Sequence, residues 1–476
     1  MSCGRKIFVN FVQMSLWVEI TQWTIFIVYT VVTLGTMLVV LLENRQPAKT
    51  TAWLVVLALL PVAGLVFFFF FGQDLRRRRR LRTNHVFRET QSETEHKMQG
   101  TLQDFFARDN HAPLCRGSVS LLDSGQDYLE ALLTDISQAK RYILIETFIY
   151  EDGIMGRTLR DALVRKAEAG LSVYLLYDDV GSYATKKAFF RSFGKVQTAA
   201  FLPVRFARLT RRANYRNHRK ICVIDGHTAY AGGMNIADRY LSLGKNRPWR
   251  DLQLRTCGAS AAELQKIFVR DWQYATRQYI SLDKCTFSQE KKQNVCMQVV
   301  SGAPVARFPE LEMGLTRLIF SACRNVYVQT PYFLPTEPVM KALQSAAMAG
   351  VDVRLILPEK PDSRLLRWGN ATYLREVLEA GVRVYLMRAP AFLHAKAITV
   401  DDETASVGSA NFDFRSFENN FETNVIVYDP QTAVAVREIM THDLALCREI
   451  SLTEWQSRPL GERLAASVTR IFSPLL

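Results

Sequence analysis

The sequence lacks the cysteine patterns that mark a disulfide scaffold or a metal site. It contains no Cys-x-x-Cys pair, and its eight cysteines are scattered along 476 residues without a compact framework. Such spacing is typical of free thiols in a reducing compartment. No Cys/His spacing of the kind found in zinc sites accompanies the motifs described below, and no nucleotide-binding motif is visible. We therefore expect neither a metal nor a cofactor.

Acidic residues are also in short supply. The chain has 46 Asp and Glu against 60 Lys and Arg, which gives a formal net charge of +14. A surplus of this size indicates a polyanionic partner, either nucleic acid or an anionic membrane surface. The length favours two or three structural units over a single small domain.

Charge is absent altogether from two stretches near the N-terminus, Ile20–Leu42 and Thr50–Gln73. At 1.5 Å per helical residue, each could cross a hydrocarbon core of about 30 Å. The first stretch is too long for the apolar part of a signal peptide, and a second follows at once. We expect residues 1–82 to form a two-helix transmembrane hairpin with spans at about 20–42 and 51–73, in which Pro61 could kink the second helix.

The flanks of these stretches predict their orientation. Arg76–Arg80 follow the second stretch directly, and Arg5 and Lys6 precede the first, whereas the short connecting loop is nearly neutral. Because cytoplasmic flanks carry an excess of Lys and Arg, we expect both termini and the remaining chain to lie in the cytoplasm.

The body of the chain contains one motif twice. Residues 217–235 read NHRKICVIDGHTAYAGGMN, and residues 393–411 read LHAKAITVDDETASVGSAN. Each copy has His-x-Lys-x-x-x-x-Asp, then Gly-Gly or Gly-Ser, then Asn, and every position recurs 176 residues later (218 to 394). The matched residues are His218, Lys220, Asp225, Gly232, Gly233 and Asn235, and His394, Lys396, Asp401, Gly408, Ser409 and Asn411.

The spacing within the motif indicates phosphate chemistry. Side chains two apart on an extended strand share a face, so His and Lys of each copy point together, ahead of the apolar runs 221–224 and 397–400. Lys can neutralise phosphate oxygens while His attacks phosphorus, and Asn235 and Asn411 add hydrogen-bond donors to the same oxygens. The motif aspartates lie at an odd spacing, so we expect structural work from them. A surface strand with two polar residues is the alternative for a single copy.

The chain around the two motifs is also duplicated. AKRYILIETFIY resembles ACRNVYVQTPYF, and AEAGLSVYLLY resembles AMAGVDVRLIL, each followed by alternating helical and strand patterns. The economical interpretation is an α/β fold made of two α/β/α domains related by a pseudo-twofold axis. We place domain 1 at residues 119–290, domain 2 at 291–476, and a linker at 83–118.

These paired motifs resemble the HKD motifs of the phospholipase D superfamily, and the match spans roughly residues 119–476. The resemblance implies two halves that face each other around one active site, with His218 as nucleophile and His394 as acid/base. The catalytic set would be His218, Lys220, Asp225, His394, Lys396 and Asp401. A catalytic His also needs a partner on its far nitrogen. Glu422 and Asp251 resemble the acids with that role in the superfamily, a solvated acid at a strand end being the alternative.

Three further segments suggest contact with lipid or with the body. Residues 204–220 contain seven basic and no acidic residues, which favours a rim for anionic headgroups over an ordinary solvated face. Ser363–Asn370, SRLLRWGN, is either a second interfacial patch or ordinary loop packing. The amphipathic segment 460–476 is expected to dock onto the body. The rim residues are Arg205, Arg208, Arg211, Arg212 and Arg216.

The complete layout resembles bacterial cardiolipin synthases of the phospholipase D type: two N-terminal spans, then NYRNHRK, QTPYFLP, FLHAK and a terminal FSPLL. The resemblance implies a multi-pass protein of the bacterial inner membrane that condenses two phosphatidylglycerol molecules to cardiolipin and glycerol through a phosphatidyl-histidine. Its partners would be phosphatidylglycerol, cardiolipin and an anionic membrane, without nucleic acid; a homodimer is compatible with the sequence. The alternatives are a phospholipase D-type hydrolase or other transphosphatidylase, a membrane-tethered nuclease, and a non-catalytic lipid-binding scaffold.

Overall fold

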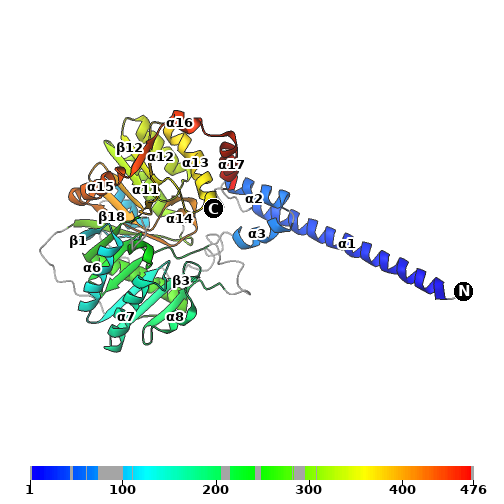
Figure 1. Cartoon of the computed structure of the whole chain (residues 1–476), viewed down its shortest axis with the longest axis horizontal. Helices are drawn as coiled ribbons and strands as arrows, with labels where there is room; N and C mark the ends of the chain where they lie inside the picture. Colours follow the sequence, from blue (N-terminus) through cyan, green and yellow to red (C-terminus); the bar gives the residue numbers. More distant parts are fainter. Residues whose placement is uncertain are drawn as a thin grey trace. The chain divides into compact units, whose positions relative to one another are not determined.

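A computed structural model describes residues 3–42, 47–60, 62–72, 100–109, 111–204, 215–241, 248–280, 282, 295–306 and 308–472. The chain divides into two compact units, an N-terminal helical unit that ends at Gln73 and a catalytic body that begins at Asp74. Figure 1 shows both units, and each is described by itself below.

The N-terminal unit contains one long apolar helix, α1 (Cys3–Leu42), whose segment Trp17–Leu42 is long and apolar enough to cross a membrane. Its apolar side chains are largely exposed, for example Leu34, as lipid-facing side chains would be. Such a helix fits membrane association.

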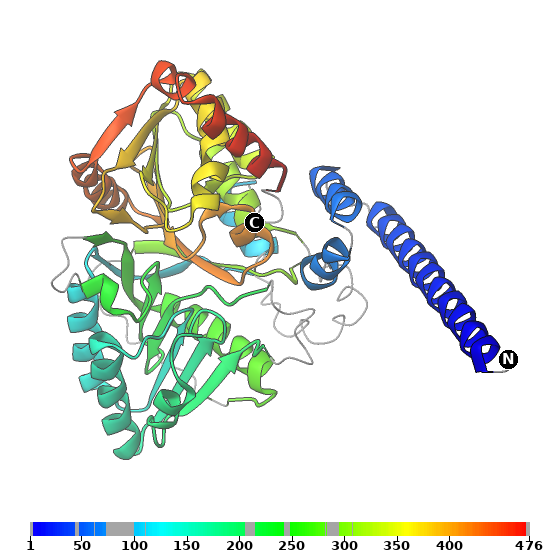
Figure 2. The same ribbon diagram turned by 45° about the vertical axis from the view of Figure 1, so that its right-hand side comes forward.

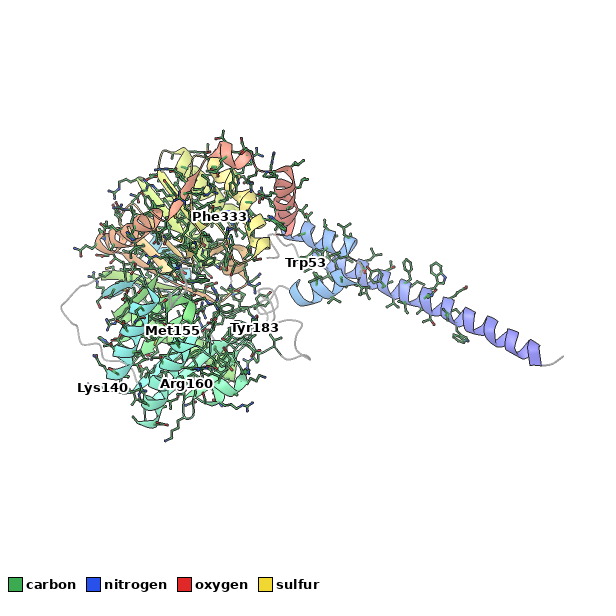
Figure 3. The ribbon with its side chains drawn as sticks, viewed as in Figure 1. Trp53, Lys140, Met155, Arg160, Tyr183 and Phe333 are labelled. Atoms are coloured by element: carbon green, nitrogen blue, oxygen red, sulfur yellow. The ribbon has the colours of Figure 1, made fainter. Side chains whose placement is uncertain are left out.

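The predicted second span is not one continuous helix. The chain forms α2 (Pro47–Leu59) and α3 (Ala63–Phe71) instead, so α1 is the one helix of spanning length among the described residues. The break falls around Pro61, which has no N–H for the helical ladder. Trp53 of α2 packs edge-on against Phe68 of α3, with ring centroids 5.2 Å apart, and Trp53 is labelled in Figure 3. The predicted two-helix hairpin is therefore not confirmed, while one apolar helix of spanning length is present.

The catalytic body is built on one 15-stranded sheet with the strand order β19-β13-β12-β10-β15-β16-β18-β9-β1-β8-β6-β5-β2-β3-β4. The first half supplies β1 (Cys115–Leu122), β2 (Tyr142–Thr147), β3 (Ser172–Asp178), β4 (Gln197–Phe201), β5 (Ile221–Ile224), β6 (Thr228–Gly232) and β8 (Gln253–Gly258). The second half supplies β9 (Val295–Gly302), β10 (Asn325–Gln329), β12 (Asp352–Pro358), β13 (Arg383–Met387), β15 (Ala397–Val400), β16 (Thr404–Gly408), β18 (Glu422–Tyr428) and, at the edge, β19 (Cys447–Ile450).

The strand order is symmetric about the junction of the two halves, where β1 pairs antiparallel with β9. From that junction outward, β8, β6, β5, β2, β3 and β4 correspond to β18, β16, β15, β10, β12 and β13. The predicted duplication is thus present, with two α/β halves that share a continuous sheet. The predicted buried runs 221–224 and 397–400 are strands β5 and β15.

Helices cover both faces of this sheet (Figures 1 and 2). The first half contributes α6 (Gly125–Gln138), α7 (Ile154–Glu168), α8 (Lys187–Arg191) and α10 (Ala259–Thr276). The second half contributes α11 (Glu310–Phe320), α12 (Glu337–Met348), α13 (Arg364–Glu379), α14 (Phe414–Glu418), α15 (Pro430–Leu444), α16 (Leu452–Gln456) and α17 (Leu460–Phe472). One apolar cluster joins the halves, because it includes Phe268 and Trp272 of α10 together with Val299 and Val425 of the second half.

Part of the predicted linker 83–118 belongs to this body. Helix α5 (Leu102–Asp109) packs against α11 of the second half, where Phe106 is fully buried beside Gly314. The Gln298 amide in β9 donates to the carbonyl oxygens of Gln103 and Ala112, at 3.0 and 2.7 Å. The described part of residues 100–118 therefore packs as part of the body and is not a free linker. Residues 83–99 and the predicted domain boundary near residue 290 lie outside the described residues.

Candidate active site

The first motif is held in place by the opposite half of the chain. Asn217 forms an isolated parallel bridge with Phe421, and the His218 amide donates to the Phe421 carbonyl at 3.0 Å. Two residues later, the Lys220 ammonium donates to the His218 carbonyl at 2.5 Å, directly before β5. His218 and Lys220 thus lie together at the start of β5, an interior strand of the sheet, as the spacing predicts.

The second motif repeats this arrangement with the halves exchanged. The short strand β14 (Phe392–Leu393) pairs with β7 (Trp249–Arg250) of the first half, and the His394 amide donates to the Arg250 carbonyl at 2.7 Å. The Lys396 ammonium lies 2.8 Å from His394 Nδ1. Each half therefore positions the histidine of the other.

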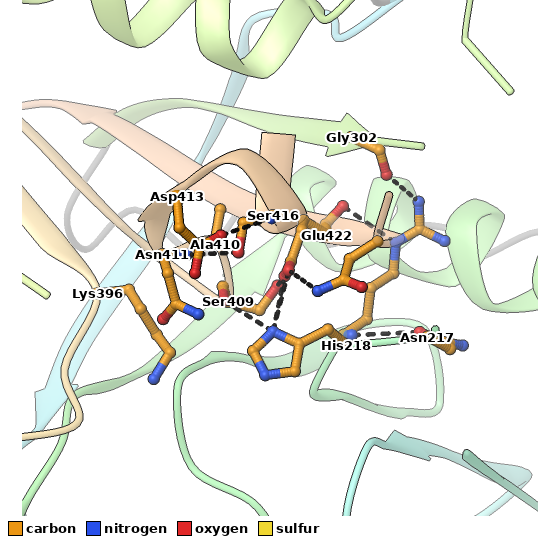
Figure 4. Close-up of polar contacts among 12 residues, drawn as sticks. Asn217, His218, Gly302, Lys396, Ser409, Ala410, Asn411, Asp413, Ser416 and Glu422 are labelled. Atoms are coloured by element: carbon orange, nitrogen blue, oxygen red, sulfur yellow. Dashed lines mark hydrogen bonds and ion pairs between the residues drawn. The ribbon is translucent and has the colours of Figure 1, made fainter. Parts of the chain in front are cut away.

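An acidic side chain from the opposite half contacts the Nδ1 atom of each histidine. For His218 this is Glu422, whose two oxygens lie 3.0 and 3.1 Å away, and the Ser409 carbonyl is also within 3.1 Å. For His394 it is Asp251, at 2.6 Å. Figure 4 shows His218 pointing toward Ser409 and Glu422, with Lys396 and Asn411 at the same site.

The electrostatic environment of each histidine includes charges from both motifs. Burial is the main cause that lowers the pKa of His394 well below its ordinary value, and the charges of Lys396 and Lys220 lower it further. Burial likewise lowers the pKa of His218 to about 4, with Lys396 of the other half among the contributing charges. Charges from both motifs therefore act on each histidine, as convergence on one cleft requires.

The two carboxyl groups respond differently to burial. Burial raises the pKa of Asp251 to about 7. Burial also acts to raise the pKa of Glu422, but His218, Lys220 and the Ser409 hydroxyl outweigh it and lower the pKa below its ordinary value. Glu422 is therefore ionised near neutral pH, whereas Asp251 is close to its titration midpoint.

The Gly-Gly versus Gly-Ser difference between the motifs contributes to this contrast. The Ser409 hydroxyl donates to Glu422. At the matching position of the first motif, a β-carbon on Gly233 would collide with the Asp251 carboxylate. The first motif therefore requires glycine beside Asp251, and the second uses serine to hold the longer Glu422.

The two motif asparagines differ in their partners. The Asn235 amide is used within the protein, because its oxygen accepts from the Ile149 N–H and its nitrogen donates to the Tyr240 hydroxyl, both at 3.0 Å. Asn411 is buried next to the site, and its Oδ1 has no hydrogen-bond partner among the described residues. A phosphate contact therefore stays a prediction for both, and Asn411 is better placed for it.

The motif aspartates support the sheet and face away from the histidines. Asp225 accepts the backbone N–H groups of residues 140–142 at 2.8–2.9 Å. Asp401 accepts those of residues 323–325 at 2.7–2.9 Å. Both occupy left-handed backbone positions, with φ of 52° and 55°, which Asp tolerates better than most residues. Their role is structural, and their place in the predicted catalytic set is not supported.

Replacing Asp401 with alanine should therefore reduce stability. Three backbone N–H groups lose their charged acceptor. Alanine also has no polar side chain to compensate for the left-handed backbone at this position. We therefore expect the free energy of unfolding to fall by about 2–4 kcal/mol. Asp401→Asn keeps one acceptor and tolerates this backbone, so it should lose about half as much. Thermal unfolding of both variants measures the difference. A variant that melts like the parent but is inactive per folded molecule would contradict this role.

The predicted headgroup rim is only partly described. Arg205, Arg208, Arg211 and Arg212 lie outside the described residues. Arg216 is buried, with its guanidinium 3.4 Å from Asp178 and its backbone carbonyl accepting from Phe421 N–H. The burial of Arg216 does not fit its predicted place on the headgroup rim, because the backbone pairing that positions His218 also buries Arg216.

Several aromatic residues at the site carry no signal in the motif itself. The Phe148 ring lies 5.0 Å from that of His218 and faces the Lys220 ammonium at 5.4 Å. The Tyr240 hydroxyl lies 3.4 Å from His394 Nδ1, and the Trp249 ring is 5.5 Å from the His394 ring. Phe148 falls in the repeated segment ILIETFIY, and its position just after the predicted strand was the one feature of the sequence that could have indicated a site residue. Across the part of the chain that is described, no three His, Cys, Asp or Glu side chains converge as metal ligands.

The lysine pKa values predict a falling rate at alkaline pH. Burial lowers the pKa of Lys220 to about 7 and that of Lys396 to about 8. Each lysine is charged below its pKa and neutral above it, so the charge that neutralises phosphate is lost as pH rises. We expect kcat/KM to fall by about tenfold or more from pH 7 to 9, and Lys220→Arg, which stays charged, to flatten the first part of the decline. A rate that is constant to pH 9 would contradict this.

Three comparisons bear on the identity of this site. The family model "Cardiolipin synthase, PLD-like domain" matches residues 132–272 and 315–444, and the model "Phospholipase_D-nuclease N-terminal" matches residues 23–73. The chain is 35% identical over 465 residues to the major cardiolipin synthase ClsA of Bacillus subtilis, covering 92% of this chain and 96% of that protein. It is also 35% identical to cardiolipin synthase 1 of Staphylococcus aureus, with 93% and 95% covered.

A solved structure shares the fold. The phosphatidylserine synthase of Haemophilus influenzae superposes with a TM-score of 0.61 at 16% identity, covering 79% of this chain and all of that one. At this identity the likeness concerns the fold alone. It supports the α/β fold with two similar halves.

Proposed function

This chain belongs to the phospholipase D-like cardiolipin synthase family, and from that premise we propose that it joins two phosphatidylglycerol molecules into cardiolipin and glycerol. The observation that carries the proposal is the reciprocal pair of histidines. Each has a lysine two residues away and an acidic side chain of the opposite half on Nδ1. Two such histidines at one site suit a double displacement at phosphorus.

In the first step, His218 acts as the nucleophile. Ionised Glu422 accepts a hydrogen bond from the Nδ1–H group of His218, which leaves the Nε2 lone pair free to attack the phosphorus of one phosphatidylglycerol. A P–N bond forms and the P–O bond to the glycerol headgroup breaks, so a phosphatidyl group is held on His218. Lys220 and Lys396 neutralise the non-bridging oxygens as charge develops on them.

His394 supplies the proton that the departing glycerol needs. Asp251 and His394 lie 2.6 Å apart, and burial raises the pKa of the acid and lowers that of the imidazole. The pair thus shares one proton near neutral pH, and an anionic phosphate beside the ring favours the imidazolium form. Transfer of this proton to the glycerol oxygen completes the first step.

The second step reverses these roles with a new alcohol. A hydroxyl of the second phosphatidylglycerol's headgroup gives its proton to His394 and attacks the phosphatidyl-histidine. The P–N bond breaks, a new P–O bond forms, and His218 returns to its neutral state. One phosphodiester replaces another, so excess phosphatidylglycerol can drive the reaction without a nucleotide.

We propose that this chemistry takes place at a membrane. The apolar helix α1 supports membrane association, and the arginines after residue 75 support a multi-pass arrangement in a bacterial inner membrane with the catalytic body on the cytoplasmic side. Donor and acceptor would then both reach the site from the inner leaflet.

A lipid product assay tests the proposal. Full-length protein in phosphatidylglycerol vesicles should release cardiolipin and glycerol in equal amounts, and His218→Ala should release neither. Phosphatidic acid as the main product would instead indicate a hydrolase. Cleavage of DNA or RNA without any lipid product would indicate a nuclease.

A further inference from the structure

Helix α17 docks onto the body through its small and polar face. Ala466 and Thr469 are buried, and the side chain of Thr469 lies beside Gly369 of α13. At the far end of the helix, Arg470 forms an ion pair with Glu376 and lies over the Tyr373 ring at 5.0 Å. Figure 2 shows α17 in red beside the yellow α13.

The apolar row of α17 points the other way. Leu460, Leu464 and Val468 are 67%, 57% and 55% exposed, and their four-residue spacing places them in one stripe on the helix. The docking predicted for segment 460–476 is therefore present, but with the opposite face from the one that amphipathic packing would bury. Single exposed leucines are ordinary on protein surfaces, whereas a whole stripe turned outward on an otherwise anchored helix is not.

Helix α13 packs against α17 and also exposes apolar and basic side chains near its start. The segment 363–370 forms the start of α13, where Trp368 is 38% exposed and Arg367 is exposed beside it. The buried side chain of Asn370 accepts from the Phe333 N–H at 3.1 Å. The start of α13 is thus fixed on one side and open on the other.

Positive charge borders the apolar stripe. Arg458 stacks on Trp455, with its guanidinium 3.8 Å from the ring centroid. Burial is the main cause that lowers the pKa of Arg458; the charge of Glu462 opposes this, and the charges of Arg463 and Arg367 lower it further. Exposed Leu, Val and Trp next to clustered Arg are typical of helices that lie in the headgroup region of anionic membranes.

We propose that this surface, the α17 face, binds the headgroup layer of an anionic bilayer and so gives the catalytic body a membrane contact of its own. The α17 face is formed by Leu460, Leu464, Val468, Trp368, Arg367 and Arg463. The inference does not depend on which lipid reaction the site catalyses. A second copy of the chain fits less well, because a twofold contact would place the arginines of each copy near those of the other.

The contact would act on the second half of the active site. Gly369 of α13 packs on Leu334 of β11 (Phe333–Leu334). Strand β11 pairs with β17 (Phe412–Asp413), which directly follows Asn411. Lipid bound at the α17 face would therefore be linked through α13 and β11 to the motif that binds phosphate.

Side-chain footprinting of the full-length protein tests the contact directly. We would compare nanodiscs of phosphatidylglycerol, nanodiscs of phosphatidylcholine, and lipid-free amphipol. Labelling of Leu460, Leu464 and Val468 should fall at least threefold in the anionic discs relative to amphipol, and less in neutral discs. Met348 on α12, which is 77% exposed, serves as the control and should not change. Equal labelling in all three samples, or protection in amphipol together with a dimer mass, would overturn the proposal.

A matched pair of substitutions tests the consequence for turnover. Leu464→Glu should reduce the rate on phosphatidylglycerol vesicles at least fivefold and leave the rate on monomeric short-chain phosphatidylglycerol within twofold of the parent. Met348→Glu should change neither. An equal loss on both substrates, or no loss on vesicles, would overturn the inference. If the parent protein forms no cardiolipin at all, the proposed function fails. The footprinting experiment still tests the membrane contact of the α17 face in that case.

Discussion

Alanine at His218 is expected to lower the rate of cardiolipin formation by at least about 10⁴-fold, the size of loss seen when a covalent nucleophile is removed. In the proposed scheme His394 cannot take over this role, because it serves as the proton donor to the departing glycerol. His394→Ala should cost a similar factor, since the departing glycerol then lacks a proton donor. Product analysis by mass spectrometry measures both losses.

A histidine close to the motif provides the control. His227 lies in the turn between β5 and β6, where its carbonyl accepts from Gly258 N–H, and its side chain is not among the site contacts. His227→Ala should keep the parental rate within about twofold and should unfold at a similar temperature.

The two catalytic variants should also differ in the intermediate. After brief exposure to lipid, the phosphatidyl group should be found on His218 in the parent and nowhere in His218→Ala. In His394→Ala it should form on His218 only slowly, because the first step lacks its proton donor. Activity retained in either histidine variant would mean that the two motifs do not serve one reaction.

Much of the site could be predicted because its residues repeat. The offset of 176 residues between the motifs implies a duplicated fold, and two-residue spacing puts His218 beside Lys220 on any extended segment. The need of a catalytic imidazole for a partner on Nδ1 directs attention to Glu422 and Asp251, and the structure places both on the expected atoms.

The remaining features depend on contacts between segments that are far apart in the sequence, and a local strand or helix pattern does not reveal such contacts. The bridge between Asn217 and Phe421 buries Arg216, so a basic run that looks solvent-facing turns inward at its last residues. Helix α5 covers the second half although it precedes the first, which makes part of a polar linker structural. The split of the second apolar stretch into α2 and α3 follows from Pro61, whose effect on a helix depends on whether neighbouring helices restore the lost hydrogen bond.

The acidic partners allow a sharper test of which histidine is the nucleophile. Glu422→Gln keeps the shape of the side chain and removes its charge, so the His218 tautomer with a free Nε2 lone pair is no longer favoured. We expect kcat to fall about 10³–10⁴-fold with little change in KM, by analogy with the loss of the acid in a serine protease triad. Glu438→Gln on α15, which is exposed, is the matched control and should not change kcat.

Asp251→Asn should be the milder substitution, by at least about tenfold. Burial raises the pKa of Asp251 to about 7, so this side chain is already protonated in a large fraction of molecules at neutral pH, and an amide resembles that form. Glu422 has a lowered pKa and is charged throughout the working range, so the amide resembles no state that it normally occupies. The difference between the two variants, each measured relative to the parent, should narrow as pH rises above 7, because Asp251 is then ionised in the parent and the amide no longer resembles it. If Asp251→Asn proves the more damaging change, His394 is the nucleophile and the order of the two steps is reversed.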